Sequence, residues 1–317
     1  MTDLSRLVDA IHSRHRAVNS PAIDALQMAL LEQYGTAMVA LLFYGSCLRS
    51  GDHQDGLVDL YVIVDSYRHT YGRWPPALAN KLLPPNVFYL EVPTSAGMVR
   101  AKYAIVSLED LEHDTSGHCF HSYFWARFAQ PTGIAYTRTP QVEQRIDRAF
   151  AQAVHTFLTR TLPRLPASFE ASELWQQGLR LTYSAELRAE RPERVIALYA
   201  ASSEYYLEVL DAALDSLPYR IEIESATAPH RLYAHIPNRT RVLNRVAWTL
   251  RRVQGKLLSV LRLFKALFTF QAGVEYILWK IERHSGVKAK VPARLEKHPL
   301  LASLVLFWQI RRRGGFR

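Results

Sequence analysis

A glycine–serine pair followed by an acidic strand combines residue types that suit phosphate chemistry. Gly45 and Ser46 end one apolar run, and Asp59 lies within a second apolar run, thirteen residues after Ser46. The backbone N–H groups of a Gly-Ser turn can hold phosphate oxygens, while a carboxylate can hold the Mg²⁺ that bridges them. The alternative interpretation is two hydrophobic strands joined by a turn, with one exposed aspartate.

Strands are expected on both sides of that turn. Residues 37–43 predict an apolar strand that enters the turn, and residues 58–64 predict the strand that carries Asp59. The other predicted elements are helices over 3–35 with a break near Ser20-Pro21, a short helix over 77–83, a β-hairpin over 87–92 and 102–106, and a mostly helical chain over 142–217. The expected fold class is therefore α+β.

The acidic strand offers one carboxylate where phosphate-transferring sites often use two. Its alternation places Tyr61 on the same face as Asp59, two residues on, so no second acid follows there. Asp65 shares that face, but it lies about 20 Å away at a rise of about 3.3 Å per residue, too far to share an ion with Asp59. We expect Asp65 to cap the end of the strand.

Positive charge is concentrated at the C-terminal end of the chain. The formal net charge is +10, yet residues 231–317 contain 19 Lys and Arg against 3 acids, whereas residues 1–230 contain 20 against 26. Such asymmetry favours a polyanionic partner, either nucleic acid or an anionic membrane. With this boundary the predicted organisation is a first domain over 1–140, a helical domain over 141–238 that completes the site, and basic amphipathic helices over 239–317.

The basic region has the pattern of helices that lie in a membrane interface. One apolar stripe separates from the Arg and Lys residues on a helical wheel, and it consists of Leu243, Val246, Leu250, Val253, Leu257, Val260, Leu261, Phe264 and Phe268. The alternative is a helical cap whose stripe is buried and whose basic face is solvated. No segment is long and apolar enough to predict a membrane span, and the N-terminus lacks a secretory signal pattern. A peripheral location on the inner, cytoplasmic face of a membrane is expected.

The chain contains two cysteines, Cys47 and Cys119. No Cys/His spacing is typical of a zinc site, and a reducing compartment is expected. Cys47 directly follows the Gly-Ser turn, where we expect it to pack as a small residue rather than act as a nucleophile.

The turn and acidic strand resemble the nucleotidyltransferase site of the DNA polymerase β type, apart from the missing second acid. A closer resemblance is to the mitochondrial-type phosphatidate cytidylyltransferases, the translocator-assembly-and-maintenance group, whose acidic strand also lacks that acid. Five segments carry it in chain order: Tyr44-Gly45-Ser46, Leu57-Val58-Asp59-Leu60, Lys102 to Ser107, Tyr123 to Pro131 and Leu181 to Arg188. The sequence departs from the family pattern by Ala104 and Ala185 in place of Gly, and by Glu186 in place of Asp. The family's Trp-His has only an approximate counterpart in Arg68-His69.

The resemblance implies a polymerase-β-like nucleotidyltransferase domain and the reaction of CTP with phosphatidate to give CDP-diacylglycerol and pyrophosphate. It implies Mg²⁺ on Asp59 and Glu186, and a nucleotide-binding cradle of Tyr44, Gly45, Ser46 and Lys102. The implied catalytic residues are Asp59, Lys102, Arg127, Glu186 and Arg188. The expected partners are CTP and phosphatidate in an anionic membrane, with nucleic acid not favoured.

Two other functions remain open from the sequence. The basic tail could bind nucleic acid in an RNA-modifying nucleotidyltransferase-like protein, although its leucine and aromatic content favours a membrane. Alternatively, Tyr61 could mark a catalytically inactive nucleotidyltransferase scaffold. The residues do not identify the base of the nucleotide.

Overall fold

A computed structural model describes residues 3–14, 20–45, 47–48, 57–95, 97–187, 191–225 and 231–269. Two of the predicted site residues, Ser46 and Arg188, lie outside these ranges, as does the basic region beyond residue 269. The fold is mixed α and β, as predicted.

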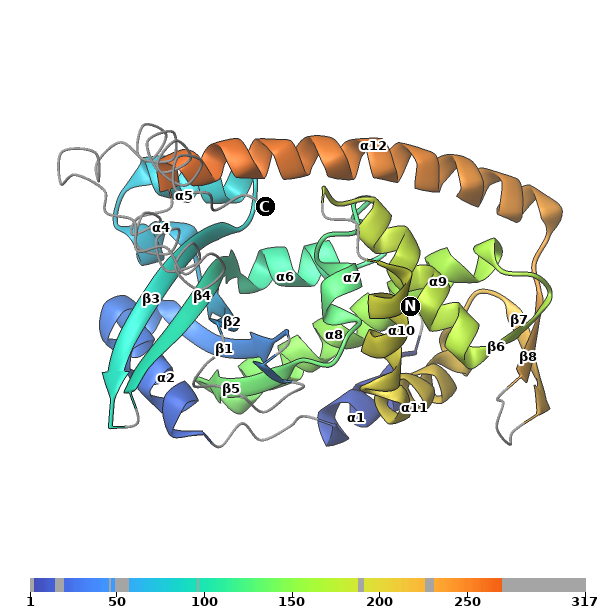
Figure 1. The fold of residues 1–317 in the computed structure, drawn as a ribbon, viewed down its shortest axis with the longest axis horizontal. Coiled ribbons are helices and arrows are strands. Elements are labelled where there is room, and N and C mark those ends of the chain that lie inside the picture. Colours follow the sequence, from blue (N-terminus) through green and yellow to red (C-terminus); the bar gives the residue numbers. More distant parts are fainter. Residues whose placement is uncertain are drawn as a thin grey trace, which may run out of the picture.

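A five-stranded mixed sheet forms the centre of the N-terminal half (Figure 1), and its strands are ordered β3-β4-β2-β1-β5. All neighbours are antiparallel except β2 and β4, which run parallel. The strands are β1 (Met38–Tyr44), β2 (Leu57–Val64), β3 (Asn86–Thr94), β4 (Gly97–Ser107) and β5 (Gly133–Thr137). The apolar runs around the Gly-Ser turn are thus the two antiparallel strands β1 and β2.

Alternation along β2 divides its side chains between two hydrophobic clusters. Val58, Leu60 and Val62 enter a cluster on one face, and Tyr61 and Ile63 enter the other, all fully buried. The first face packs against α2 (Pro21–Tyr34) and α4 (Tyr67–Tyr71). The second cluster receives side chains from α1 (Ser5–Ser13), α6 (Leu108–Thr115), α7 (Trp125–Phe128) and α8 (Pro140–Thr161), and from helices of the second half. The short helix α5 (Trp74–Leu82) follows α4.

The second half is helical and continues the same core. Trp175 stacks on Phe157 of α8 with ring centroids 5.0 Å apart and contacts Tyr206 at 4.6 Å. One cluster of buried side chains runs from Leu7 to Trp248, so both halves share it. The elements are α9 (Ala171–Ser184), α10 (Pro192–Ala200), α11 (Ser203–Ala213), the 3-10 turns Gly35–Ala37, Leu162–Arg164 and Leu214–Ser216, and a small sheet ordered β6-β8-β7 from β6 (Ser168–Glu170), β7 (Arg220–Ser225) and β8 (Arg231–His235).

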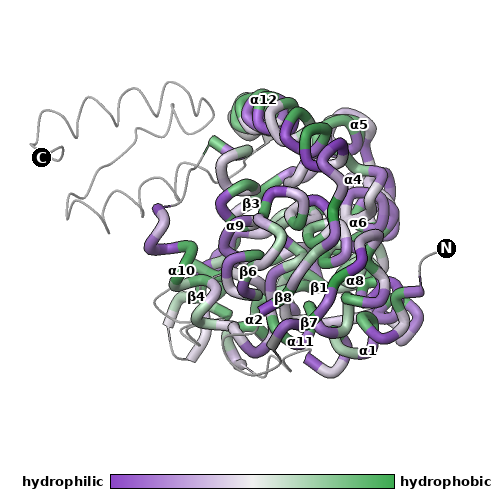
Figure 2. Tube along the Cα trace, turned by 90° about the vertical axis from the view of Figure 1, so that its right-hand side faces the viewer, coloured by the Kyte–Doolittle hydropathy of each residue, from purple (hydrophilic) through white to green (hydrophobic). Residues whose placement is uncertain are grey.

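A single long helix, α12 (Asn238–Thr269), crosses the molecule and forms its outer edge in two perpendicular views (Figures 1 and 2). The predicted apolar stripe lies on its outer side, since Leu250, Val253 and Leu257 are each more than half exposed. Trp248 and Arg251 are buried beneath the helix. The alternative of a cap with a buried stripe is therefore wrong for the described part of α12. Among the helices that the structure describes, none is long and apolar enough to cross a membrane.

Candidate functional site

The Gly-Ser turn and the acidic strand meet directly. Tyr44, the last residue of β1, is the register partner of Asp59 on β2. Gly45 follows with a φ of +89°, and a Cβ built on it would lie 2.9 Å from Asp59 Oδ2. Both the backbone conformation and the close approach of the carboxylate require a glycine here. The structure thus brings together the two residues on which the sequence interpretation depends.

Lys102 joins this group from the neighbouring strand. Asp59 and Lys102 are register partners in the parallel β2–β4 pair, so their side chains share one face of the sheet. Both are half-buried, which leaves part of each side chain accessible to a ligand. The two residues therefore lie on one face of the sheet, on neighbouring strands next to the turn.

Tyr44 connects this group to Arg127 on α7. Arg127 Nη1 donates a hydrogen bond of 3.3 Å to Tyr44 Oη, and its guanidinium lies 5.4 Å from the centre of the Tyr44 ring and 4.9 Å from that of Tyr123. Burial raises the pKa of the Tyr44 hydroxyl, the Arg127 charge opposes the rise, and the Asp59 charge adds to it. The hydroxyl therefore stays protonated at neutral pH and can donate a hydrogen bond.

Glu186 completes the group from the end of α9. Its Oε1 lies 3.9 Å from Arg127 Nη2, and the two side chains are 27% and 24% exposed. The separation is long for an ion pair, and Arg127 is also held by Tyr44 and Tyr123, so Glu186 is the partner with more freedom to turn to a ligand. Asp59, Tyr44, Arg127 and Glu186 thus form a connected series of polar groups drawn from four elements of the fold.

Tyr61 occupies the position where a second acid would follow Asp59. Its ring is fully buried and contacts Tyr44 at 4.9 Å, Phe128 at 5.1 Å and Phe124 at 6.1 Å between centroids. Burial raises the pKa of its hydroxyl well above the ordinary value. Tyr61 therefore acts as a core residue that supports Tyr44 from below.

Asp65 and His69 lie at the other end of β2. His69 Nδ1 is 2.9 Å from Asp65 Oδ2, and Asp65 also accepts a hydrogen bond from the Ser66 backbone N–H. Asp65 therefore caps this end of the strand, as predicted. The structure pairs His69 with Asp65 and does not bring it to the Gly45 turn.

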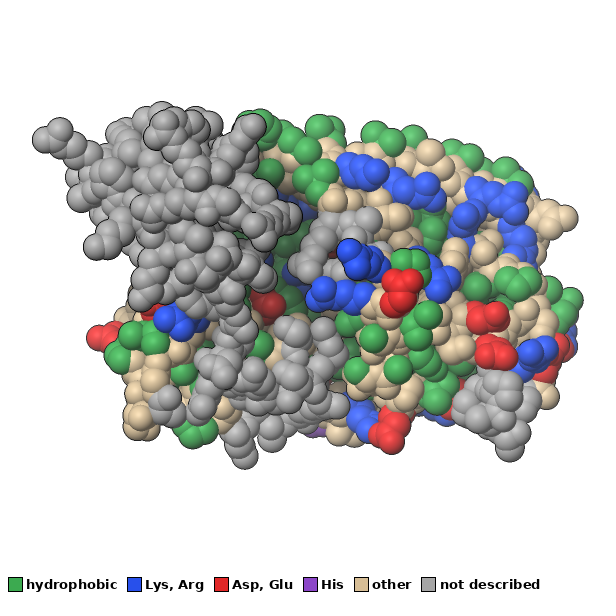
Figure 3. Space-filling model, in the orientation of Figure 1, with side chains coloured by type: hydrophobic (Ala, Val, Ile, Leu, Met, Phe, Trp, Pro, Cys, Tyr) green, Lys and Arg blue, Asp and Glu red, His purple; other side chains and the backbone are tan. Residues whose placement is uncertain are grey.

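The sequence analysis missed Arg262, which reaches toward the site from α12. Its guanidinium lies 4.0 Å from the centre of the Tyr123 ring, and its Nε donates a 2.8 Å hydrogen bond to the Pro84 carbonyl. Burial lowers the pKa of Arg262, while the charge of Glu186 is among those that oppose this. Figure 3 shows a recess beneath α12 with Lys and Arg side chains along its rim.

Gly255 explains how α12 approaches so closely. A Cβ built on Gly255 would lie 2.4 Å from the Ala185 carbonyl oxygen, which is adjacent to Glu186. A glycine within an amphipathic helical pattern was the available sign of this contact. The helix therefore roofs the site at the point where Glu186 and Arg127 meet.

A separate cavity of about 400 Å³ lies near the junction of α10 and α11. Its lining includes Arg14, Leu48, Thr132, Ser202 and Ser203, and none of the described candidate site residues. It is close to the turn only through Leu48, so the polar series above is a distinct region.

Neither a protein-family model nor a curated protein matches this chain.

Proposed function

We propose that this protein is a phosphatidate cytidylyltransferase that forms CDP-diacylglycerol and pyrophosphate from CTP and phosphatidate at a membrane surface. The contact between Gly45 and the Asp59 carboxylate carries the proposal. It joins a phosphate-binding type of turn to an acid in the arrangement that the resemblance to nucleotidyltransferases implies. Lys102, Arg127 and Glu186, which come from the other matching segments, lie near the same place.

The donor set fits Mg²⁺. Carboxylate oxygens are the ligands that Mg²⁺ prefers, and a side chain at position 45 would crowd Asp59 Oδ2. Asp59 would hold the ion, with Glu186 as the second candidate ligand. When bound, Mg²⁺ supplies charge neutralisation and orientation of the triphosphate.

The cationic side chains address the main obstacle to the reaction, which is repulsion between two anions. Lys102 beside Asp59 would contact the triphosphate, and Arg127 can bind phosphate oxygens through two N–H groups. The attacking phosphate monoester of phosphatidate is already largely anionic near neutral pH, since its second pKa is about 6. No strong general base is therefore needed, and catalysis consists of positioning and electrostatic stabilisation.

The exposed stripe of α12 supports a membrane location for the lipid substrate. Nine large apolar side chains of α12 are 44–65% exposed, Arg239, Arg245 and Lys256 are exposed on the same helix, and the helix has no acid. An apolar face with cationic neighbours suits an anionic lipid surface rather than water or RNA. Phosphatidate stays in the bilayer, so docking through α12 would bring the candidate site close to the surface that holds its lipid substrate.

The proposal is tested with CTP, Mg²⁺ and vesicles that contain phosphatidate, with CDP-diacylglycerol and pyrophosphate as the measured products. Asp59→Asn is expected to lower turnover by about 100- to 1000-fold, the range lost when a main electrostatic group of a site is removed. Asp65→Asn, on the same strand but paired with His69, is the matched control and is expected to keep most activity. Full activity of Asp59→Asn would refute the site.

One observation favours a second candidate, an inactive nucleotidyltransferase scaffold. Tyr61 is a buried aromatic at the position of the second acid, so that position contributes no metal ligand. Thermal-shift titration with CTP, ATP, GTP and UTP in Mg²⁺ separates the candidates when it is combined with the product assay. Binding of a nucleotide without product in phosphatidate vesicles would support the scaffold.

A further inference from the structure

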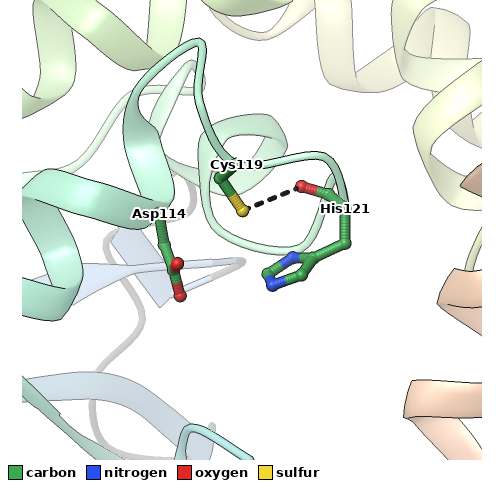
Figure 4. A group of neighbouring side chains, drawn as sticks. All are labelled: Asp114, Cys119 and His121. Carbon is green, nitrogen blue, oxygen red and sulfur yellow. Dashed lines mark hydrogen bonds between the residues drawn. The ribbon is translucent and has the colours of Figure 1, made fainter.

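Three potential metal ligands, whose sequence spacing is not typical of a zinc site, converge near the end of α6. Asp114 ends that helix, and Cys119 and His121 follow in the loop that leads to α7 (Figure 4). One ligand atom of each residue lies within 4.8 Å of the other two, and the side chains point toward one another. Asp114 and Cys119 are buried, and His121 is half-buried.

We propose that Asp114, Cys119 and His121 bind one divalent transition-metal ion, of which Zn²⁺ fits the mixed S, N and O donors best. Zinc bonds of about 2.0–2.3 Å place tetrahedral ligands about 3.5 Å apart, so the side chains need to close by about 1 Å. Three protein ligands leave the fourth position to a water molecule. This site goes beyond the proposed transfer reaction and does not depend on it.

His121 offers a ring nitrogen that an ion could bind. Its Nδ1 is buried and has no hydrogen-bond partner in the described part of the chain. Few buried polar atoms lack a partner, and a bound ion is one way to satisfy such an atom. An ion at this position would satisfy the orphaned nitrogen.

The charges of the ligand set balance a dication. Asp114 is held by His113, whose Nδ1 lies 2.9 Å from Asp114 Oδ1, and this contact leaves the other carboxylate oxygen for an ion. Metal binding would displace the proton of Cys119 into solvent, so the thiolate and carboxylate together supply two negative charges. These two charges cancel the charge of the ion. Arg160 adds a positive charge nearby, where it donates hydrogen bonds to the carbonyls of Cys119 and Gly117.

The surrounding contacts suggest what the ion would stabilise. Arg160 donates hydrogen bonds to the carbonyls of Cys119 (2.7 Å) and Gly117 (2.8 Å), and Arg251 of α12 donates one to Phe120 (2.7 Å). The loop is thus held on its outer side by two arginines, and the ion would hold it to α6. Since the same loop leads to Tyr123 and Arg127, the ion would position one wall of the candidate site.

The test uses full-length protein without a histidine tag, stripped with a chelator and then titrated with Zn²⁺ or Co²⁺. We expect one ion per chain, a thiolate-to-cobalt charge-transfer band and a rise in melting temperature on metal addition. Cys119→Ser should abolish the band, and His121→Gln and Asp114→Asn should weaken binding by at least about 10-fold. Cys47→Ser and Asp59→Asn are controls and should keep both the band and the stoichiometry.

Because the substituted residues are buried, the wild-type chain supplies the decisive measurements. No uptake of Zn²⁺ or Co²⁺ by the stripped wild type, a spectrum without the thiolate band, or a band that persists in Cys119→Ser would overturn the proposal. Loss of metal in Asp59→Asn instead would assign the ion to the candidate active site.

Discussion

The strand β2 and the helix α12 distribute polar and apolar side chains in opposite ways. On β2 the apolar side chains fill two cores, and Asp59, near the start of the strand, is only half-buried. On α12 the apolar stripe faces outward, while Arg251 and Arg262 face the molecule. The strand buries its apolar side chains within the protein. The helix leaves a contiguous apolar surface exposed, and such surfaces mark interaction sites. The proposed function therefore assigns the transfer chemistry to the Gly45 end of β2 and the membrane contact to α12.

The largest effect is expected from charged substitutions in the exposed stripe of α12. Leu250→Glu combined with Leu257→Glu places two acids on side chains that are 57% and 58% exposed. Vesicle flotation should show at least about 100-fold weaker binding to anionic vesicles, because burial of each leucine is worth about 1.5–3 kcal/mol. The melting temperature should stay nearly unchanged, since the side chains face away from the core.

The matched control charges two exposed apolar residues elsewhere, Met28 on α2 and Ile196 on α10, which are 64% and 47% exposed. This Met28→Glu and Ile196→Glu protein should bind vesicles as the wild type does. Equal loss of binding in both double variants would remove the special role of α12.

Gly45→Ala tests the role of the close approach between Gly45 and Asp59 on β2. The added Cβ would meet Asp59 Oδ2 at 2.9 Å, and the φ of +89° is strained for alanine, so the carboxylate must shift. We expect a loss of turnover of about 10-fold or more, with a stability loss of about 1–3 kcal/mol from the strained backbone.

Gly72→Ala separates strain from contact. Gly72 also has a positive φ of 62°, but nothing lies within 4 Å of its added Cβ. It should lose comparable stability in thermal unfolding and keep full turnover. If Gly45→Ala behaves the same way, its close approach to Asp59 has no functional role.

The local parts of this molecule could be predicted from the sequence. The alternation in 58–64 and the apolar run before Gly45 identified β2 and β1, because both patterns lie within a few residues. By contrast β5 (Gly133–Thr137) and β6 (Ser168–Glu170) are short and mostly half-buried, and were missed. Their strand character comes from pairing with distant chain.

The site shows the same division between local and distant information. The contact of Gly45 with Asp59 follows from a strand–turn–strand pattern, whereas the approach of Arg127 to Glu186 was expected only through the resemblance. Arg262 could not be placed, since its contact with Tyr123 joins residues 139 positions apart in the sequence. Which face of α12 points outward was equally undetermined, because both faces are compatible with one wheel.

Gly255→Ala tests whether α12 is docked by close packing. Alanine favours an isolated helix by about 1 kcal/mol over glycine, so a free helix would be stabilised. In the docked helix the new Cβ would lie 2.4 Å from the Ala185 carbonyl oxygen, and we expect a net loss of about 1–3 kcal/mol and faster amide exchange in α12. Gly117→Ala, where nothing lies within 4 Å of the added Cβ, is the control.

The last expected effect is a dependence of α12 docking on pH through Lys265. Burial and the nearby charge of Arg262 lower the pKa of Lys265 to about 7, and its Nζ donates hydrogen bonds to the carbonyls of Leu83 and Pro85. Between pH 7 and 9 the detached helix binds a proton that the docked helix does not, so docking becomes more stable as the pH rises. The slope is at most about 1.4 kcal/mol per pH unit. Amide exchange of α12, corrected for the intrinsic rate, should therefore slow from pH 6 to pH 9. Lys265→Met should lose this dependence, and an identical pH profile in that variant would show that another group titrates.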